Sequence, residues 1–499
     1  MKHVTWMLAL CIPLAARAAA PTPNRVYGQP DDQTILYVNP NMPPAARMGA
    51  PRGVAADDTG LYVADRSLSR VLFFPADATV ASRVYGQPDF TSTNYNGYGL
   101  NADSMAVPWY IDVSKAGLIV TDWRNSRIIF YPTGSTRASL AYGSANLYSC
   151  APAWDGVSPS SLTYPAGCAI EDDGTAYLAD SQARVLRCPP GTTLANGVYG
   201  PPDLTTWLGG CDAQRIGVPF GLAVDSTGLY VADADNNRVV FFPKGSTTAT
   251  RVYGQPTFTS NAANNGGVGP NSLAAPMEVA TDDTGVYIVD QANYRVLYYP
   301  GASTTATYVY GQPDLLTNDG PSGLTSGQKF WPSAVAVDAF SVFISDEYGA
   351  RVLRYDKPFP TARSMEFAMQ PSGGTAGKAL PQSPTVRLLH ADGSPAVEYN
   401  GPVHLRLKAG VGPECALLSG AATAQAVNGV AVFGGLKIDT AGSYVLQATC
   451  HSLPVADSVI IPIAAPPASF AADADHDGKL TISDPVLMLR ALYGFDALS

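Results

Sequence analysis

Short apolar segments alternate with polar turns at a fixed interval between residues 25 and 356. In each unit a proline precedes a first apolar segment, most copies continue with an Asp-x-x-Gly link, and a second apolar segment ends in Asp before an Arg opens a third. The units start at Pro51, Pro108, Pro165, Pro219, Pro276 and Pro332, so the spacings are 57, 57, 54, 57 and 56 residues. A second motif, Arg-Val-Tyr-Gly-Gln-Pro from Arg25, recurs with the same step. The pattern predicts six copies of one β-strand unit.

Each unit predicts four short strands, because its apolar segments are rich in β-branched, aromatic and small residues between turn residues. In the fourth copy these segments are 221–225, 228–233, 238–242 and 250–253. One four-stranded sheet cannot bury both of its faces, whereas six sheets around a shared axis bury them against one another. We therefore predict an all-β chain with a six-bladed β-propeller over residues 25–370. Arg25–Gln29 is expected to complete the sixth blade, with Arg363–Phe367 as the alternative.

The run Pro219–Val239, which reads PFGLAVDSTGLYVADADNNRV, resembles the NHL repeat. The resemblance extends over about residues 45–356 and implies an NHL-type propeller. NHL propellers serve as protein-binding, nucleic-acid-binding, sensor and lyase domains, so the resemblance predicts the fold and leaves the function open.

Each copy also pairs the Asp at the end of its second segment with the following Arg. Because a functional site is usually singular, six repetitions of one pair indicate a scaffold bond between carboxylate and guanidinium. The pairs are Asp65 with Arg70, Asp122 with Arg127, Asp180 with Arg184, Asp233 with Arg238, Asp290 with Arg295, and Asp346 with Arg351.

The first 20 residues have the pattern of a cleaved signal peptide, with Lys2, an apolar stretch from Trp6 to Leu14 and small residues before Pro21. We expect a secreted, periplasmic or extracellular protein. No other segment is apolar for long enough to span a bilayer. Export and a net charge of −10 disfavour a nucleic-acid partner.

Six cysteines follow the signal peptide, an even number suited to an oxidising compartment. None has Cys-x-x-Cys spacing, which disfavours a metal or redox role. We predict the disulfides Cys415–Cys450 and Cys150–Cys211, with three connectivities open among the four cysteines near the third unit.

The composition changes after the propeller. Residues 371–384 are rich in Pro, Ser, Gly and Ala and are predicted to be a linker. Short alternating segments over 385–465 predict a β-sandwich. The run 426–446 resembles bacterial Ig-like domains of exported proteins, and the resemblance implies a spacer or a surface-interaction role.

Residues 470–499 carry the spacing of a calcium-binding loop. Side-chain oxygens fall at positions 1, 3, 5, 9 and 12, a backbone carbonyl at position 7, and Gly478 at the bend. Calcium prefers six to eight oxygen ligands, so we predict that calcium is bound as a cofactor. The predicted ligands are Asp473, Asp475, Asp477, Lys479, Thr481 and Asp484.

This segment resembles one half of a dockerin, through Asp-x-Asp-x-Asp-Gly and the helical stretch that follows Asp484. Dockerins carry two such halves and this chain has one. The resemblance implies a cohesin-like partner and an accessory role in a polysaccharide-degrading assembly as one alternative function.

Departures from the repeat identify candidate ligand-binding residues near the channel mouth. Tyr110 and Glu278 replace the glycine of Pro-x-Gly, and Asp112 stands where the other copies have Ala. Units two and five face each other across a six-membered ring, so Asp112 and Glu278 are expected to approach the channel from opposite sides. The candidates are Arg52, Trp109, Tyr110, Asp112, Phe220, Glu278 and Trp331.

Long loops that lead into the next unit are expected on the same face. Aromatic rings beside amide groups suit sugars or extended peptides. The aromatic residues of these loops are Phe90, Tyr95, Tyr98, Tyr148, Trp154, Trp207 and Phe258.

We favour non-catalytic recognition of an extracellular or cell-surface glycan or protein by this loop-bearing face, and we assign no catalytic residue. The five histidines are at positions 3, 390, 404, 451 and 476, outside the repeats, which disfavours histidine-dependent lyases of this fold. A metal-dependent lyase or hydrolase that uses Asp112 and Glu278 is the alternative.

Overall fold

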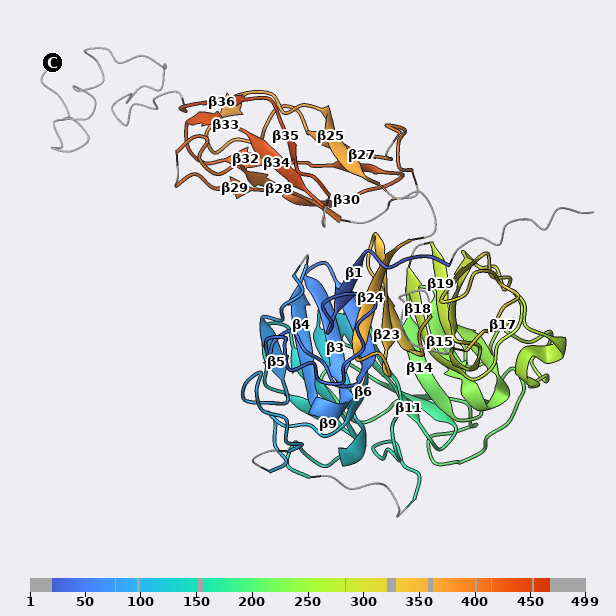
Figure 1. Cartoon of the computed structure of the whole chain (residues 1–499). Helices are drawn as coiled ribbons and strands as arrows, with labels where there is room; N and C mark the ends of the chain where they lie inside the picture. The colour runs from blue at the N-terminus through green and yellow to red at the C-terminus, as the bar shows by residue number, and fades with distance from the viewer. Residues whose placement is uncertain are drawn as a thin grey trace, which may run out of the picture. The chain divides into compact units, whose positions relative to one another are not determined.

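Four-stranded antiparallel sheets repeat through the first part of the chain (Figure 1). The computed structural model describes residues 20–466 except 77, 97–98, 150–155, 283, 321–328, 358–361, 391, 398, 400–401, 414 and 451–452. The chain divides into two compact units, Met1–Pro358 and Phe359–Ser499. Residues 1–19 of the predicted signal peptide and the whole predicted calcium segment lie outside the described residues. Among the described residues, no helix is both long and apolar enough to cross a membrane.

The described residues of the first unit form six four-stranded sheets, of which five follow the chain from an inner to an outer strand and the sixth takes the N-terminal strand as its outer strand. They are β2 (Pro51–Asp57), β3 (Gly60–Asp65), β4 (Arg70–Pro75) and β5 (Arg83–Tyr85); β6 (Pro108–Ser114), β7 (Gly117–Asp122), β8 (Arg127–Pro132) and β9 (Leu140–Tyr142); β10 (Cys168–Ile170), β11 (Ala176–Asp180), β12 (Arg184–Cys188) and β13 (Gly197–Tyr199); β14 (Pro219–Val224), β15 (Gly228–Asp233), β16 (Arg238–Pro243) and β17 (Arg251–Tyr253); β18 (Pro276–Asp282), β19 (Gly285–Asp290), β20 (Arg295–Pro300) and β21 (Tyr308–Tyr310); and β22 (Pro332–Val337), β23 (Ser341–Asp346) and β24 (Arg351–Asp356) with β1 (Arg25–Tyr27).

Short 3-10 helices occupy turns between these strands. They are η1 (Arg66–Leu68), η2 (Trp123–Asn125), η3 (Ala234–Asn236), η4 (Ala263–Gly266) and η5 (Gln291–Asn293).

The inner strands β2, β6, β10, β14, β18 and β22 contact one another in this order, and β22 contacts β2. The sheets therefore surround a common channel as a β-propeller. We call the end of the channel where these strands begin the Pro end, and the end at the Asp-x-x-Gly links the Gly end.

The N-terminal strand closes this ring, as predicted. β1 pairs antiparallel with β24, with Arg25 opposite Arg354 and Tyr27 opposite Val352. The alternative for closure is wrong, because Arg363–Phe367 lies at β25 (Ser364–Met369), which pairs with β27 (Thr385–Leu389) of the second unit.

The repeated tyrosine packs each sheet against the next one. Tyr27 lies 5.3 Å from Phe74, and Tyr253 lies 5.2 Å from Tyr299, measured between ring centroids. Both tyrosines are buried. In the third sheet a cysteine, Cys188, takes the position of the partner ring, four residues after the repeated Arg.

The scaffold function of the repeated Asp–Arg pairs is confirmed. All six pairs are fully buried, with N–O distances between 2.7 and 3.4 Å. The same guanidinium groups also donate to backbone carbonyls of the long loops, as Arg127 does to Leu147 O at 2.6 Å. Each pair thus ties a loop to the turn between the second and third strands.

The second unit is also built from strands. Its sheets are β25, β27 and β31 (Val430–Val432); β26 (Gly374–Thr375), β36 (Ile461–Ala464) and β33 (Gly442–Tyr444); β30 (Thr423–Gln425), β28 (Pro402–Leu407), β34 (Leu446–Thr449) and β35 (Ala456–Asp457); and β29 (Leu418–Ser419) with β32 (Lys437–Ile438).

The predicted boundaries 370 and 371–384 need correction, because the first unit ends at Pro358. β25 precedes residue 370 but pairs within the second unit, and β26 lies inside the predicted linker yet pairs with β36. Alternating burial in β25, such as that of Met365 and Phe367, shows why: these apolar residues cover the core of the second unit.

The predicted disulfide between Cys415 and Cys450 is absent from the structure. Cys415 is an exposed free thiol, whereas Cys450 is buried with its Sγ 3.1 Å from Tyr399 Oη. The Cys150–Cys211 pair involves Cys150, which lies outside the described residues; the Cys211 Sγ lies 3.5 Å from the carbonyl oxygens of Phe258 and Ser260.

Candidate functional site

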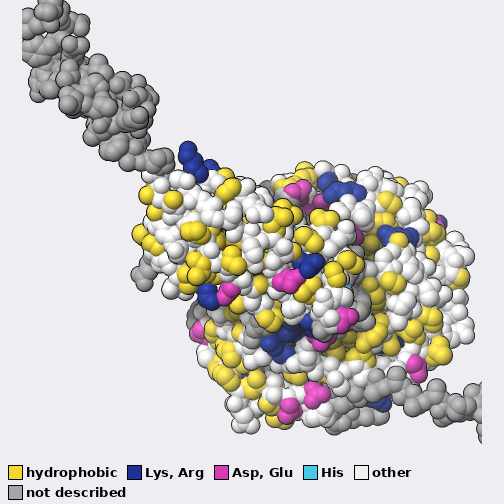
Figure 2. Space-filling model, turned by 90° about the horizontal axis from the view of Figure 1, so that it is seen from above, with side chains coloured by type: hydrophobic (Ala, Val, Ile, Leu, Met, Phe, Trp, Pro, Cys, Tyr) yellow, Lys and Arg dark blue, Asp and Glu magenta, His cyan; other side chains and the backbone are white. Residues whose placement is uncertain are grey.

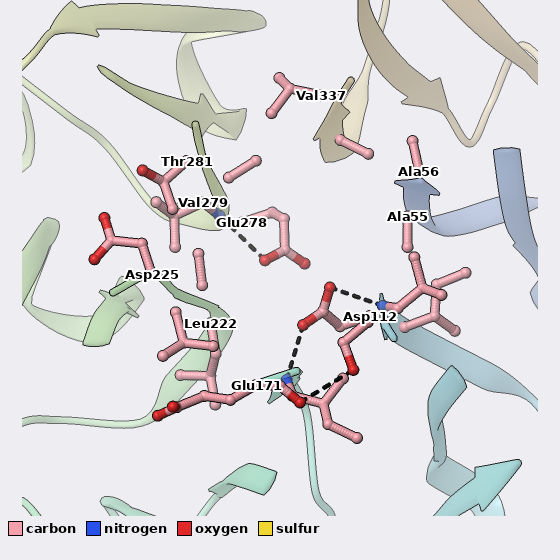
Figure 3. Close-up of a pocket in the computed structure, with 18 of the residues that line it drawn as sticks. Ala55, Ala56, Asp112, Glu171, Leu222, Asp225, Glu278, Val279, Thr281 and Val337 are labelled. Carbon is pink, nitrogen blue, oxygen red and sulfur yellow. Dashed lines mark hydrogen bonds between the residues drawn. The ribbon is translucent and has the colours of Figure 1, made fainter. Parts of the chain in front are cut away.

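The inner strands line a channel cavity of about 490 Å³ that contains two of the predicted site residues, Asp112 and Glu278 (Figure 3). Its lining combines Val, Ala, Ile and Leu residues of the inner strands with polar and charged groups. Toward the Gly end the lining becomes polar, with the exposed residues Asp172, Ser226 and Lys244. Polar residues at one end and apolar walls inside are typical of a small-molecule site.

Asp112 is held on the wall by two backbone groups. The Ile170 N–H donates to its Oδ2 at 2.8 Å, and the Val113 N–H donates to its Oδ1 at 2.8 Å. The first of these bonds comes from β10, so the carboxylate joins two neighbouring sheets. Burial raises the pKa of Asp112 to about 6, against the lowering effect of these hydrogen bonds.

Glu278 lies on β18 and is only 7% exposed. Its Oε1 accepts a hydrogen bond from the Val279 N–H at 3.1 Å. The neighbouring inner strand makes room with Gly221, where an added Cβ would lie 2.2 Å from Glu278 Oε1. Burial raises the pKa of Glu278 well above its ordinary value, and the negative charge of Asp112 raises it further.

The two carboxyl groups therefore share one cavity, and in Figure 3 they point toward each other from strands of different sheets. Within the described part of the chain, no group of three or more His, Cys, Asp or Glu side chains could hold a metal ion. The pair can bind a proton or a cation, but it supplies only part of the oxygen ligands that a hard metal ion requires.

The other predicted site residues do not line this cavity. Tyr110 is 1% exposed and donates from its hydroxyl to Ser333 O at 3.5 Å, from the second sheet to the sixth. Arg52 Nη1 binds Glu347 Oε2 at 2.7 Å, and its Cζ lies 5.8 Å from the Tyr110 ring centroid. These side chains fill the Pro end, which separates the cavity from the aromatic residues there.

A first aromatic cluster lies at the Pro end beside Arg52. The rings of Trp109 and Trp123 stack with centroids 4.7 Å apart and planes 2° apart. Arg52 Cζ lies 4.5 Å from the centroid of Trp109 on β6, and Trp123 lies 5.9 Å from Tyr164. Tyr164 is 41% exposed. Phe220, from the start of β14, is half-buried against the core that contains Tyr110.

A second aromatic cluster surrounds Trp331, just before β22. Its ring lies 5.0 Å from Tyr294 and 5.2 Å from Tyr348, both at edge-on angles. Tyr348 is 64% exposed and follows Glu347, which also binds Arg66 Nη1 at 2.6 Å. Charged and aromatic side chains therefore alternate across this end of the propeller.

We call these two clusters with Arg52, Arg66 and Glu347 the Pro-end surface. Sequence reasoning missed Arg66, Trp123, Glu347 and Tyr348, which follow the repeated Asp of their copies. The same comparison that identified Tyr110 would have found them, since the first residue after this Asp differs in every copy: Arg66, Trp123, Ser181, Ala234, Gln291 and Glu347.

The predicted wall of loop aromatics is present only in part. Tyr95, Tyr148 and Trp207 are largely exposed, and Arg124 Cζ lies 5.0 Å from the Tyr95 ring. Phe90 and Phe258 pack against core clusters instead. Tyr98 and Trp154 lie outside the described residues.

Charge is dispersed on the face of the molecule shown in Figure 2. Lys and Arg side chains lie there in small separate groups among polar and hydrophobic ones.

No protein-family model matches the chain, and no curated protein matches it. Similar solved structures include Myxococcus xanthus glutaminyl cyclase, with a TM-score of 0.30, 9% identity, and coverage of 49% of this chain and 87% of that chain. The WD40 β-propeller domain of Doa1 has a TM-score of 0.38, 8% identity and coverage of 62% and 80%. A nidogen/laminin complex has a TM-score of 0.38, 13% identity and coverage of 58% and 87%. These TM-scores are too low to say more about this chain.

Proposed function

We propose that this chain is an exported, six-bladed NHL-type propeller protein that binds another protein through the Pro-end surface without catalysing a reaction. The observation that carries this proposal is the gathering of Trp, Tyr and Arg side chains at one end of the ring. These three residue types are the ones that contribute most binding energy in protein interfaces.

A protein partner suits the geometry better than a polysaccharide. Sugar rings stack on open aromatic faces, but the faces of Trp109 are taken by Arg52 and Trp123. What remains for a ligand includes ring edges, the exposed tyrosines Tyr164 and Tyr348 with their hydroxyls, and the ion pair of Arg52 with Glu347. Edges and hydroxyls suit the mixed polar and apolar surface of a protein.

The test is selection of a displayed peptide library on the full chain. We expect enriched peptides to bind the double variant Tyr164→Ala/Tyr348→Ala at least about tenfold more weakly, about 1.4 kcal/mol, and to bind Lys244→Ala, at the Gly end, as tightly as the wild type. Both tyrosines are exposed, so the fold should survive. A chain that enriches no peptide but binds a glycan array through the same tyrosines would support a glycan partner and contradict the proposal.

The enzyme alternative lacks support at Asp112 and Glu278. A metal-dependent lyase or hydrolase needs an ion, and this pair is joined by no third ligand among the described residues. We therefore treat Asp112 and Glu278 as candidate ligand-binding groups.

For the C-terminal part we propose an Ig-like spacer followed by the calcium loop Asp473–Asp484, whose oxygen spacing supports it. Calorimetry of the full chain with calcium should give one binding isotherm. It should be lost in Asp475→Ala and unchanged in Asp457→Ala, an acidic residue of β35. An Asp475→Ala isotherm equal to that of the wild type would refute the loop. A cohesin-like partner is a further proposal that rests on this calcium loop.

A further inference from the structure

The channel cavity contains carboxyl groups that take no part in the proposed binding at the Pro-end surface. Its inner part holds two carboxyl groups, Asp112 and Glu278, and the filled Pro end separates it from that surface. Burying two carboxyl groups without a cation between them is costly, and carboxyl groups perturbed in this way in a cavity are typical of functional sites.

No basic side chain lines the inner part among the described residues. Lys244 is the basic residue of the lining, and it lies exposed at the Gly end, where its Nζ binds Glu171 Oε2 at 2.8 Å. Arg52 acts on Glu278 from beyond the cavity, but its guanidinium is paired with Glu347. The carboxyl pair is thus left without a positive partner inside its own cavity.

Glu278 is the more deeply buried of the two carboxyl groups. Its side chain is more than nine-tenths buried and lines the cavity. Its carboxylate accepts hydrogen bonds from the backbone N–H groups of Val279, at Oε1, and of Leu222. A carboxylate offers about four acceptor positions, so a ligand in the cavity can donate to Glu278 in addition to these two backbone groups.

Part of the remaining wall is hydrocarbon, and the rest is polar, with Ser114 and Thr281 among its residues. The hydrocarbon part is formed by the branched side chains Val54, Ile111, Ile170, Leu222, Val279 and Val335. A volume of about 490 Å³ lies within the range of small-molecule sites. A ligand that satisfies both parts of the cavity has one cationic donor group and an apolar stem.

We propose that the channel binds a protonated primary alkylamine, with the ammonium group between Asp112 and Glu278 and the alkyl chain along the apolar walls. An ammonium carries three N–H donors, enough for both carboxylates. Asp225, near the Gly end of the lining, attracts the cation during entry, whereas Asp172 is paired with Lys115. A hard metal ion fits less well, since it needs six or more oxygens and gains nothing from the hydrocarbon walls.

Binding should strengthen as pH rises, because the ammonium ion requires ionised carboxylates. The charged groups that face the pair are few: Arg52 at the Pro end, and Glu171, Asp172, Asp225 and Lys244 at the Gly end. The cysteine thiol on β10, Cys168, is buried beside both carboxylates, and burial raises its pKa. Cys168 therefore stays neutral over the range in which Asp112 titrates.

Calorimetry of the full chain with n-hexylamine and with 1-hexanol tests this proposal, since the two probes share the chain and differ in charge. We expect n-hexylamine to bind at pH 8, to bind at least tenfold more weakly at pH 5, and to bind at least tenfold more weakly to Glu278→Gln. Tyr348→Ala, at the Pro-end surface, should bind it as the wild type does. Tryptophan fluorescence should show that Glu278→Gln is folded.

Three outcomes would overturn the proposal. They are equal affinity for hexanol, which indicates a merely apolar cavity; unchanged affinity of Glu278→Gln; and calcium binding that needs Glu278 and displaces the amine. If Glu278→Gln fails to fold, the same measurements on Asp112→Asn test the proposal instead. Failure of peptide binding at the Pro-end surface would leave these results untouched, so the two proposals fail separately.

Discussion

Asp112 shows how one residue differs from its five counterparts. The other copies have Ala at this position. The small apolar side chain of Ala fits a narrow channel without burying a polar group. Asp112 instead accepts two backbone N–H bonds and keeps its carboxyl group half-buried in the channel. Its pKa of about 6 means that the folded protein holds this proton at pH values where the unfolded chain has lost it.

Stability should therefore fall as pH rises from about 4 to about 6. The difference in unfolding free energy between Asp112→Asn and the wild type should shift by up to about 3 kcal/mol in favour of the variant between pH 4 and pH 8. Urea unfolding followed by tryptophan fluorescence measures this in the first unit, because residues 359–499 contain no Trp.

Asp103→Asn serves as the matched control, since Asp103 is exposed and pairs with the exposed Arg137. Its difference from the wild type should vary little with pH. A shift of the same size in both variants would show that burial of Asp112 is not the cause.

At the scale of the element, the structure explains why the motif Arg-Val-Tyr-Gly-Gln-Pro recurs, which the sequence alone did not. The tyrosine of the outer strand fills the space between its own sheet and the next one. The glutamine ties the loop that follows: Gln255 Nε2 donates to Asn237 O and Ala262 O, both at 2.9 Å. The motif is thus a sheet-to-sheet contact followed by a loop anchor.

Tyr253→Ala should lower the free energy of unfolding of the first unit by about 3–5 kcal/mol, because it leaves a cavity between two sheets. Tyr253 is fully buried against Tyr299 and Tyr230. Tyr148→Ala, at an exposed tyrosine, should change the stability by less than about 0.5 kcal/mol. Equal losses in the two variants, measured by denaturant unfolding, would contradict the packing argument.

At the scale of the whole molecule, three residues of β1 close the ring. Without them β24 would present an unpaired edge, and the space between Phe74 and Phe343 filled by Tyr27 would be empty. Closure removes sheet edges that would otherwise pair with other chains.

A variant that lacks residues 20–28 should lose at least about 3 kcal/mol of stability in the first unit and should self-associate in size-exclusion chromatography. A synthetic peptide of residues 20–31, added in excess, should restore the wild-type transition by pairing with β24. Stability and elution that match the wild type without the peptide would show that β1 is dispensable for closure.

The sequence alone determined the strand repeat and the scaffold bonds of the Asp–Arg pairs, and it favoured the correct one of two candidates for the closing strand. These follow from local rules, because alternation of apolar residues and turn residues recurs with each copy. It also selected Asp112 and Glu278 as residues that differ from the repeat. It placed the end of the propeller too late, since the apolar residues of β25 could have packed in either unit.

Only the tertiary structure decided which odd residues share a site. A register shift lies between Pro108 and Ile111 in β6, and another between Pro276 and Glu278 in β18. A bulge of one residue changes which side chains face the channel, and simple alternation cannot locate it. The structure therefore put Tyr110 in the filled Pro end and Asp112 in the cavity, two residues apart in the chain.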